Sequence, residues 1–273
     1  MKSFSFTSNQ SIDYYEDSIV PLLHRMINLE ELSLYLIIDR DGAFSSFLNG
    51  NNLKKDIINH LPKLNQFLFS IHQNLCLRYC NHLPLNNDIE HTLKGLEDYR
   101  IVSYVDHFPR EKTAQCHMYT SPCQMKYYHR LTNSFLGGSF PFVNDVLLFD
   151  ERPFTYEVFR LIAQTFPFLQ RLIIQNYSKQ KRKRSKRTKF ITSIHFPRMT
   201  HLDLSEAHMD YVEQFLDHTK TSLFNAITLY VNYRCLQRVT QSFTRDTTRI
   251  NCGQSNNSTH IIKTYFPQAE NIE

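Results

Sequence analysis

The sequence lacks tryptophan, and only six of its 273 residues are glycine. Phenylalanine, with 21 residues, and tyrosine, with 15, must therefore supply the largest side chains of the core. The scarcity of glycine leaves few places for the tight backbone cradles that hold phosphate groups. The chain contains no glycine-rich phosphate loop, no H-E-x-x-H and no G-x-S-x-G motif. These absences disfavour an enzyme.

Long apolar runs are also missing. No stretch approaches the roughly 18 apolar residues that a membrane-spanning helix needs. The opening residues, MKSFSFTSNQS, contain no apolar segment typical of a secretory signal peptide. The six cysteines are too sparse for a disulfide framework. We therefore expect an intracellular, cytoplasmic protein with reduced thiols and no membrane contact.

Two cysteine–histidine groups are candidates for a metal site. They read Cys76-x3-Cys80-x-His82 and Cys116-His117-x5-Cys123. Structural zinc sites usually repeat tight C-x2-C pairs at a matching spacing, and these two groups do not match each other. We predict no metal and no cofactor.

Positive charge is concentrated in one segment, Lys179–Lys189 (KQKRKRSKRTK), which carries eight positive and no negative residues. Because the whole chain has a net charge of +5, the remainder carries −3. A solvated insertion, a nuclear localisation signal and a nucleic-acid-binding loop remain open as interpretations. The last is disfavoured because no aromatic residue interrupts the run for stacking on bases. The basic residues assigned to this loop are Lys181, Arg182, Lys183, Arg184, Lys186 and Arg187.

A short phrase recurs along the chain. It consists of an apolar residue, a proline, and then apolar positions spaced three and two apart. The copies are LPKLNQFLFS from Leu61, FPFVNDVLLF from Phe140, FPFLQRLIIQ from Phe166, FPRMTHLDLS from Phe196, and a clipped FPQAENIE from Phe266. A further copy, INLEELSLYL from Ile27, lacks only the proline.

The phrase predicts a helix that stops at the proline, followed by a short strand. Helical periodicity covers 54–61, 157–166 and 209–220. In each strand two alternate residues should face the core. These pairs are Leu32 and Leu34, Phe67 and Phe69, Val146 and Leu148, Leu172 and Ile174, Leu202 and Leu204, and Leu229 and Val231.

Units of this kind, with prolines 26 and 30 residues apart at Pro141, Pro167 and Pro197, must stack to bury their apolar sides. The period and the L-x-x-L-x-L spacing predict an α/β leucine-rich-repeat-like solenoid. Its parallel sheet would form one face and its short helices the other. We predict a single domain over residues 1–273. Its middle, about 71–139, should be irregular, with a helix over 87–96 and strands over 101–105 and 116–119.

The strand residues that alternate with the inward pairs should line the open, concave face of the sheet. Solenoids use this face to bind other proteins, and tyrosine and arginine are common anchors there. The candidate binding residues are Glu31, Tyr35, Gln66, Asp145, Phe149, Arg171, Gln175, His201, Asp203, Thr228 and Tyr230.

These stretches resemble the leucine-rich-repeat portion of F-box proteins, in particular members of expanded invertebrate families. The matching segments are INLEELSLYLI (27–37), FPFVNDVLLFDERPFTYEVFRLIAQTFPFLQRLII (140–174), MTHLDLSEAHMDYVEQFL (199–216) and TRDTTRINC (244–252).

The resemblance implies a protein-recognition module without catalysis, similar to the repeats that hold substrates for a cullin ubiquitin ligase. The residues before Ile27 offer at most one helix, so no F-box is visible. A Skp-type adaptor would be a partner only if an F-box lay upstream. A free-standing leucine-rich-repeat adaptor, and a nucleic-acid binder that uses residues 179–189, are the alternatives.

Overall fold

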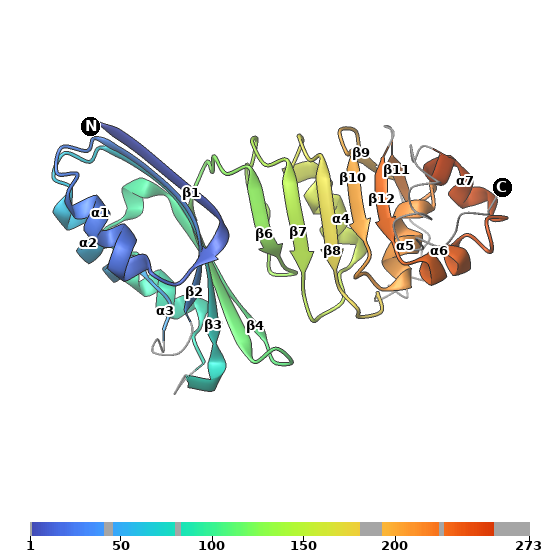
Figure 1. Cartoon of the computed structure of the whole chain (residues 1–273), viewed down its shortest axis with the longest axis horizontal. Coiled ribbons are helices and arrows are strands. Elements are labelled where there is room, and N and C mark those ends of the chain that lie inside the picture. The colour runs from blue at the N-terminus through green and yellow to red at the C-terminus, as the bar shows by residue number, and fades with distance from the viewer. Residues whose placement is uncertain (1, 41–45, 80–82, 181–192, 224–226, 254–273) are drawn as a thin grey trace. The chain divides into compact units, whose positions relative to one another are not determined.

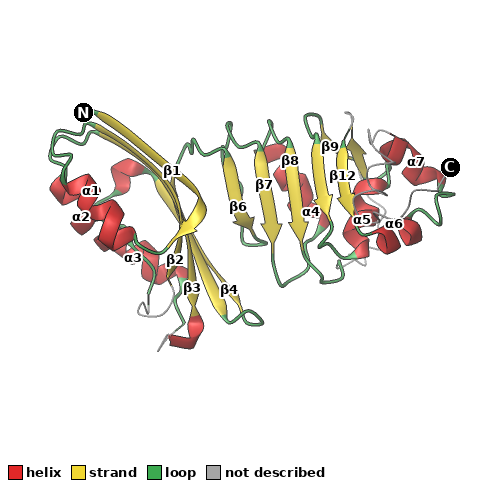
Figure 2. Cartoon of the chain, in the orientation of Figure 1, coloured by secondary structure: helices red, strands yellow, loops and turns green. Residues whose placement is uncertain are grey.

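The computed structural model describes residues 2–40, 46–79, 83–180, 193–223 and 227–253. The fold is mixed α/β, with parallel strand pairing and helices packed against the sheets (Figures 1 and 2). The chain divides into two compact units. Unit 1 comprises Met1–Met125 with Gly138–Phe140, and unit 2 comprises Lys126–Gly137 with Pro141–Glu273. No helix in the described part of the chain combines the length and apolar character needed to cross a membrane.

Unit 1 contains a five-stranded sheet in the order β1-β2-β3-β5-β4. The strands are β1 (Ser3–Ile12), β2 (Glu31–Arg40), β3 (Gln66–Cys76), β4 (Ile101–Phe108) and β5 (Thr113–Thr120). The helices are α1 (Val20–His24), α2 (Gly50–Asp56) and α3 (Asn86–Thr92), with a π-helical turn at Tyr15–Ile19 and 3₁₀ turns at Ile58–His60, Leu77–Tyr79 and Glu97–Tyr99. Residues of all three helices join one core cluster with the apolar face of this sheet.

Unit 2 contains a wholly parallel five-stranded sheet in the order β12-β10-β8-β7-β6 and a small parallel pair, β9 and β11. The strands are β6 (Tyr127–Leu131), β7 (Asp145–Phe149), β8 (Arg171–Gln175), β9 (Ile194–Phe196), β10 (His201–Leu204), β11 (Thr221–Leu223) and β12 (Thr228–Val231). The helices are α4 (Tyr156–Thr165), α5 (Met209–Leu216), α6 (Tyr233–Val239) and α7 (Asp246–Gly253). Figure 1 shows α4 and α5 on one side of this sheet.

At Leu61, Phe166 and Phe196 the recurring phrase forms a β-turn that leads into a strand; the copy from Phe266 lies outside the described residues. The apolar residue before the proline accepts a backbone hydrogen bond from the residue three positions later, so the proline occupies the second turn position, which suits its fixed φ. The bonds are Leu64 N to Leu61 O (3.0 Å), Leu169 N to Phe166 O (3.1 Å) and Met199 N to Phe196 O (3.4 Å). The copy without proline makes the same turn, from Leu29 N to Met26 O at 2.9 Å.

At the start of several parallel strands, one backbone carbonyl accepts hydrogen bonds from two consecutive amides at the start of the neighbouring strand. Gln170 O accepts bonds from Thr200 N (2.8 Å) and His201 N (2.9 Å), two consecutive amides of the following strand. The carbonyls of Lys2, Glu30, Lys126 and Asn144 accept pairs of amides in the same way. The backbone therefore starts successive strands in the same register in both units.

The prediction of the inward face is confirmed. All twelve of the alternate residues named above are at most 6% exposed. They align across strands, as Leu172 does with Val146 and Leu202. The register therefore puts one apolar side of each strand on the helices, as the period-two pattern requires.

The helices are partly as predicted. The helix expected over 157–166 is α4, and the one expected over 209–220 is α5. The segment 54–61 is split between α2 and a 3₁₀ turn. Pro197, however, follows strand β9 and not a helix. The residues before Pro197 form a strand because they alternate: Ile194 and Phe196 are buried and His195 is exposed.

The middle section departs from the expected parallel sheet. Both strands predicted there exist, as β4 and β5, but they pair antiparallel, and β5 is antiparallel to β3. Only residues 109–112 join β4 to β5, and a parallel crossover needs a dozen or more residues. The predicted helix over 87–96 is shorter, α3, with Asp88 accepting a bond from Leu85 N at 2.9 Å.

The sequence reasoning missed β1 altogether. Its residues Phe4 and Phe6 align with Leu32 and Leu34 of β2 and so occupy the inward positions of one more repeat. The alternation S-F-S-F was the available signal, but no proline phrase precedes it. Of the basic segment, Lys179 is exposed, whereas Lys181, Arg182, Lys183, Arg184, Lys186 and Arg187 lie outside the described residues.

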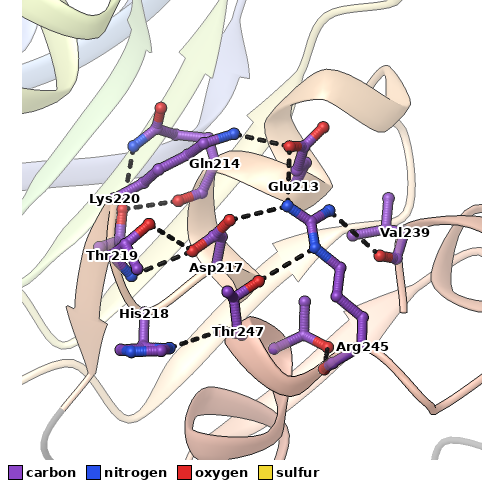
Figure 3. A network of polar contacts seen from close by, with 11 residues as sticks. Glu213, Gln214, Asp217, His218, Thr219, Lys220, Val239, Arg245 and Thr247 are labelled. Carbon is purple, nitrogen blue, oxygen red and sulfur yellow. Dashed lines mark hydrogen bonds and ion pairs between the residues drawn. The ribbon is translucent and has the colours of Figure 1, made fainter. Parts of the chain in front are cut away.

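A polar network ties the last helix of unit 2 to α5 (Figure 3). Nη2 of Arg245 lies 2.9 Å from Oδ2 of Asp217 and 3.2 Å from Oε1 of Glu213. Lys220 Nζ donates to the same Glu213 oxygen at 2.7 Å. Asn251 of α7 donates to two backbone carbonyls beyond the network, those of Phe215 and Thr221.

Burial would raise the pKa of Asp217 and of Glu213. Hydrogen bonds to both carboxylates, together with the positive charges of Lys220 and Arg245, outweigh burial and hold both pKa values below the ordinary range. The two carboxylates of the network are therefore ionised near neutral pH and are paired with Lys220 and Arg245.

We expect Leu172→Ala to lower the free energy of unfolding by about 2–5 kcal/mol, because it leaves a cavity at a fully buried site. The matched change Ile173→Ala, on the half-buried opposite face, should cost only about 1 kcal/mol. Urea unfolding measures both. Equal losses would contradict the assignment of the two faces.

We expect Arg245→Met to lower the free energy of unfolding by about 1–3 kcal/mol near neutral pH, since it removes charged hydrogen bonds from a half-buried site. Both carboxylates have depressed pKa values when folded. Their contribution is therefore complete above the ordinary values of 4.5 and 3.8 and is lost as the pH falls below them.

The difference between wild type and Arg245→Met should accordingly shrink in strong acid, as followed by urea unfolding across pH. Arg249→Met serves as the control, because the ion pair that Arg249 forms with Asp246, at 3.3 Å, is exposed to solvent. An undiminished difference in acid would show that the ion pairs do not stabilise the fold.

Candidate functional site

The candidate site is the face of the unit 2 sheet opposite the inward residues. Its first row runs across all five strands in register. The members are Tyr127, Asp145, Arg171, His201 and Thr228. With neighbouring strands about 4.8 Å apart, the row is about 19 Å long.

A second row lies two residues further along the strands. It consists of Leu147, Ile173, Asp203 and Tyr230 in register. Leu147 is 9% exposed and Tyr230 is 37% exposed, so the row passes from an apolar end to an aromatic, accessible end. We call these two rows the open strip.

The first row is charged and incompletely paired. Arg171 Nη1 is 3.8 Å from Asp145 Oδ2, and half of the Arg171 side chain is exposed, so this ion pair is weak. Burial raises the pKa of Asp145, against the opposing positive charges of Arg171 and His201. The other oxygen, Oδ1, is buried without a hydrogen-bond partner. The row thus presents an accessible guanidinium beside a partly desolvated carboxylate.

Aromatic side chains extend this surface on both sides. Beyond the second row, the Arg130 guanidinium lies 3.7 Å from the centre of the Phe149 ring. Before the first row, the turns expose Phe142 (56%) and Phe168 (43%), and Arg198 lies 4.5 Å from the centre of the Phe168 ring. Arginine on aromatic rings in a solvent-accessible setting is a frequent feature of binding surfaces.

The structure distributes the predicted binding residues over two sheets. Eight belong to the unit 2 sheet, namely Asp145, Phe149, Arg171, Gln175, His201, Asp203, Thr228 and Tyr230. The other three, Glu31, Tyr35 and Gln66, belong to the unit 1 sheet, where Glu31 and Gln66 are neighbours in register and are exposed. Tyr35 is half-buried, and burial raises its pKa to about 12.

Sequence reasoning missed several members of the surface. Tyr127 went unnoticed because β6 has no proline phrase, although the apolar residues of YYHRL gave a weak signal. Phe168 and Arg198 sit at the third turn position, directly after the proline, and the recurrence of that position could have marked them.

Unit 1 holds a second polar cluster on the face opposite its apolar core. Ser70 Oγ lies 2.8 Å from His117 Nε2, and Tyr104 Oη lies 3.2 Å from His117 Nδ1. A serine–histidine pair could act in nucleophilic catalysis only if a substrate reached the hydroxyl. Ser70 and His117 are 6% and 2% exposed, and the interactions join β3, β5 and β4. We interpret the cluster as cross-strand support.

Cys116 and Cys123, from the second cysteine–histidine group, are poorly suited to act as reactive thiols. Burial raises the pKa of the Cys116 thiol far above its usual range and that of Cys123 to about 11, which disfavours the thiolate. No group of three or more possible metal ligands occurs in the part of the chain that is described. Cys80 and His82 lie outside it.

A scan against models of protein families, a search of curated proteins and a search of solved structures each found no match to the chain.

We expect Arg171→Met to raise the pKa of the Asp145 carboxyl further, because it removes a positive charge that lowers this pKa. The matched control is Arg160→Met, an exposed arginine on α4. A pH titration of the Asp145 side-chain carbon by NMR measures the effect. An unchanged pKa in Arg171→Met would show that Arg171 does not act on this carboxyl.

Proposed function

We propose that the protein is a recognition module that binds another protein through the open strip of unit 2. The observation that carries the proposal is the alignment of Tyr127, Asp145, Arg171, His201 and Thr228 in one outward row. The strands hold the backbone of these residues rigid, so binding does not have to order the main chain.

The chemistry of the strip fits a protein partner. An interface commonly combines an apolar centre with polar groups around it, and tyrosine and arginine often carry much of the binding energy. The half-buried Ile173 supplies apolar surface, and Arg171 and Tyr230 supply exposed anchors of those two types. The partly exposed carboxylate of Asp145 adds an acceptor for a partner's cationic group.

The repeat architecture supports the finer proposal of a leucine-rich-repeat-like solenoid. In unit 2 the strands of the five-stranded sheet follow one another in sequence order, and β7, β8 and β10 are each entered through the same shared-carbonyl junction. The resemblance to F-box repeats adds that the bound protein would be a ubiquitin-ligase substrate. The free-standing adaptor is the alternative within the same binding role.

We expect photo-crosslinking from the strip to capture one protein partner in cells. Tyr230 is replaced with the photo-reactive residue p-benzoylphenylalanine, and the crosslinked protein is identified by mass spectrometry. Arg171→Glu in the same chain should abolish the crosslink, because it places a negative charge beside Asp145 and removes an anchor. Arg160→Glu, the same charge change on the helix side, should leave the crosslink intact.

Two further results bear on this proposal. Replacing Phe243, an exposed aromatic residue outside the strip, with the same photo-reactive residue should not give this crosslink. Equal crosslinking from both positions, or its survival in Arg171→Glu, would contradict binding through the strip. If the ligase-related proposal holds, the captured protein should persist longer in cells that lack this chain.

A further inference from the structure

Strand β1 forms one edge of the unit 1 sheet and pairs only with β2 among the described strands (Figure 1). It is ten residues long and contains no charged residue and no proline. Edge strands are usually short, charged, interrupted by proline or bulged, because an open edge invites pairing with another strand. The register with β2 is regular from Ser3 to Thr7 and shifts only beyond Thr7.

The free hydrogen-bonding groups of this edge are identifiable. Lys2 O accepts a bond from Glu31 N at 3.0 Å, so alternate residues from Lys2 onward direct their backbone groups toward β2. The residues between them, Ser3, Ser5 and Thr7, therefore direct their N–H and C=O groups away from the sheet. Their side chains are exposed as well.

Apolar side chains at this edge are only partly covered. Phe4 and Phe6 align with Leu32 and Leu34, which are 1% and 0% exposed. The two phenylalanines pack against the same core but remain only partly buried, since the sheet ends beside them. One more strand with apolar residues at matching positions would cover them.

We propose that β1 pairs antiparallel with β1 of a second copy of the chain, about a two-fold axis at Ser5. Ser5 then faces its own counterpart, Ser3 faces the partner's Thr7, and Phe4 faces the partner's Phe6. The three outward residues of each strand form hydrogen-bonded pairs, giving about six hydrogen bonds. The two phenylalanine pairs fall at non-hydrogen-bonded positions, where side chains are closest.

The self-complementary pattern favours a second copy over an unrelated strand. The phenylalanines are symmetric about Ser5, and like residues meet without repulsion because the strand is uncharged. A closed two-fold contact also covers the β1 edge of both copies at once. The pairing is independent of the open strip, which lies on the other unit.

The contact is small. Stable interfaces bury about 1,200–2,000 Å², and a five-residue strand pair falls at or below the lower end of that range. We therefore expect a reversible dimer whose population rises with protein concentration.

Analytical ultracentrifugation of the full chain tests the proposal. The wild type should shift from 32.5 kDa toward twice that mass as concentration increases. Ser5→Pro should remain monomeric, because proline removes the outward N–H at the two-fold axis while sparing the bonds to β2. Ser5→Ala retains this N–H and should dimerise like the wild type. Circular dichroism checks that each variant is folded.

A second measurement keeps the test decisive if Ser5→Pro fails to fold. Ser5→Cys places two thiols across a hydrogen-bonded pair, where Cα atoms about 5.5 Å apart fit a disulfide. Mild oxidation should give a crosslinked dimer, and mass spectrometry should find the two introduced thiols joined to each other in one disulfide-linked peptide. Arg171→Glu should not affect this crosslink. A wild type that stays monomeric at every concentration, a folded Ser5→Pro that dimerises, or a Ser5→Cys that does not crosslink would overturn the proposal.

Discussion

The rest of the structure depends on the carbonyl that two consecutive amides share at the start of parallel strands β2, β3, β7, β8 and β10. Gln170 O binds two consecutive amides of the next strand, and the equivalent carbonyls in both units do the same. Backbone bonds of this kind could form in more than one register, so the turn geometry and the apolar pattern select the register that is observed. Inward columns such as Val146–Leu172–Leu202 and outward rows such as Asp145–Arg171–His201 both follow from that register.

What the sequence predicted well is what short-range chemistry decides. A proline after Phe166 ends α4 and sets the turn, and the apolar spacing that follows assigns Leu172 and Ile174 to the core. Once the inward residues are known, the outward face follows from the pleat. Eight residues of the candidate site were therefore identifiable as surface residues of one parallel sheet, although their partners in space were not.

What the sequence could not supply depends on longer-range factors. The direction of β5 follows from its short connection to β4. The pairing of β5 with β3 depends on tertiary contacts, which no local pattern in the sequence encodes. Strand β1 has the alternation of a repeat strand but lacks the turn phrase, so the alternation alone did not identify it as part of the repeat. The division of the predicted binding residues between two sheets likewise follows from where the chain stops adding parallel strands after β3.

The dimensions of the open strip constrain how a partner can bind. Strands of four or five residues present one outward row across all five strands and a second across four of them, so the strip is about 19 Å long and about 7 Å wide. That area is well below the interface of a stable complex. A partner held by Arg171 and Tyr230 must therefore also contact the flanking turns, where Phe142 and Phe168 are exposed directly before the first row. The turn that sets the register thus also supplies aromatic surface beside the site.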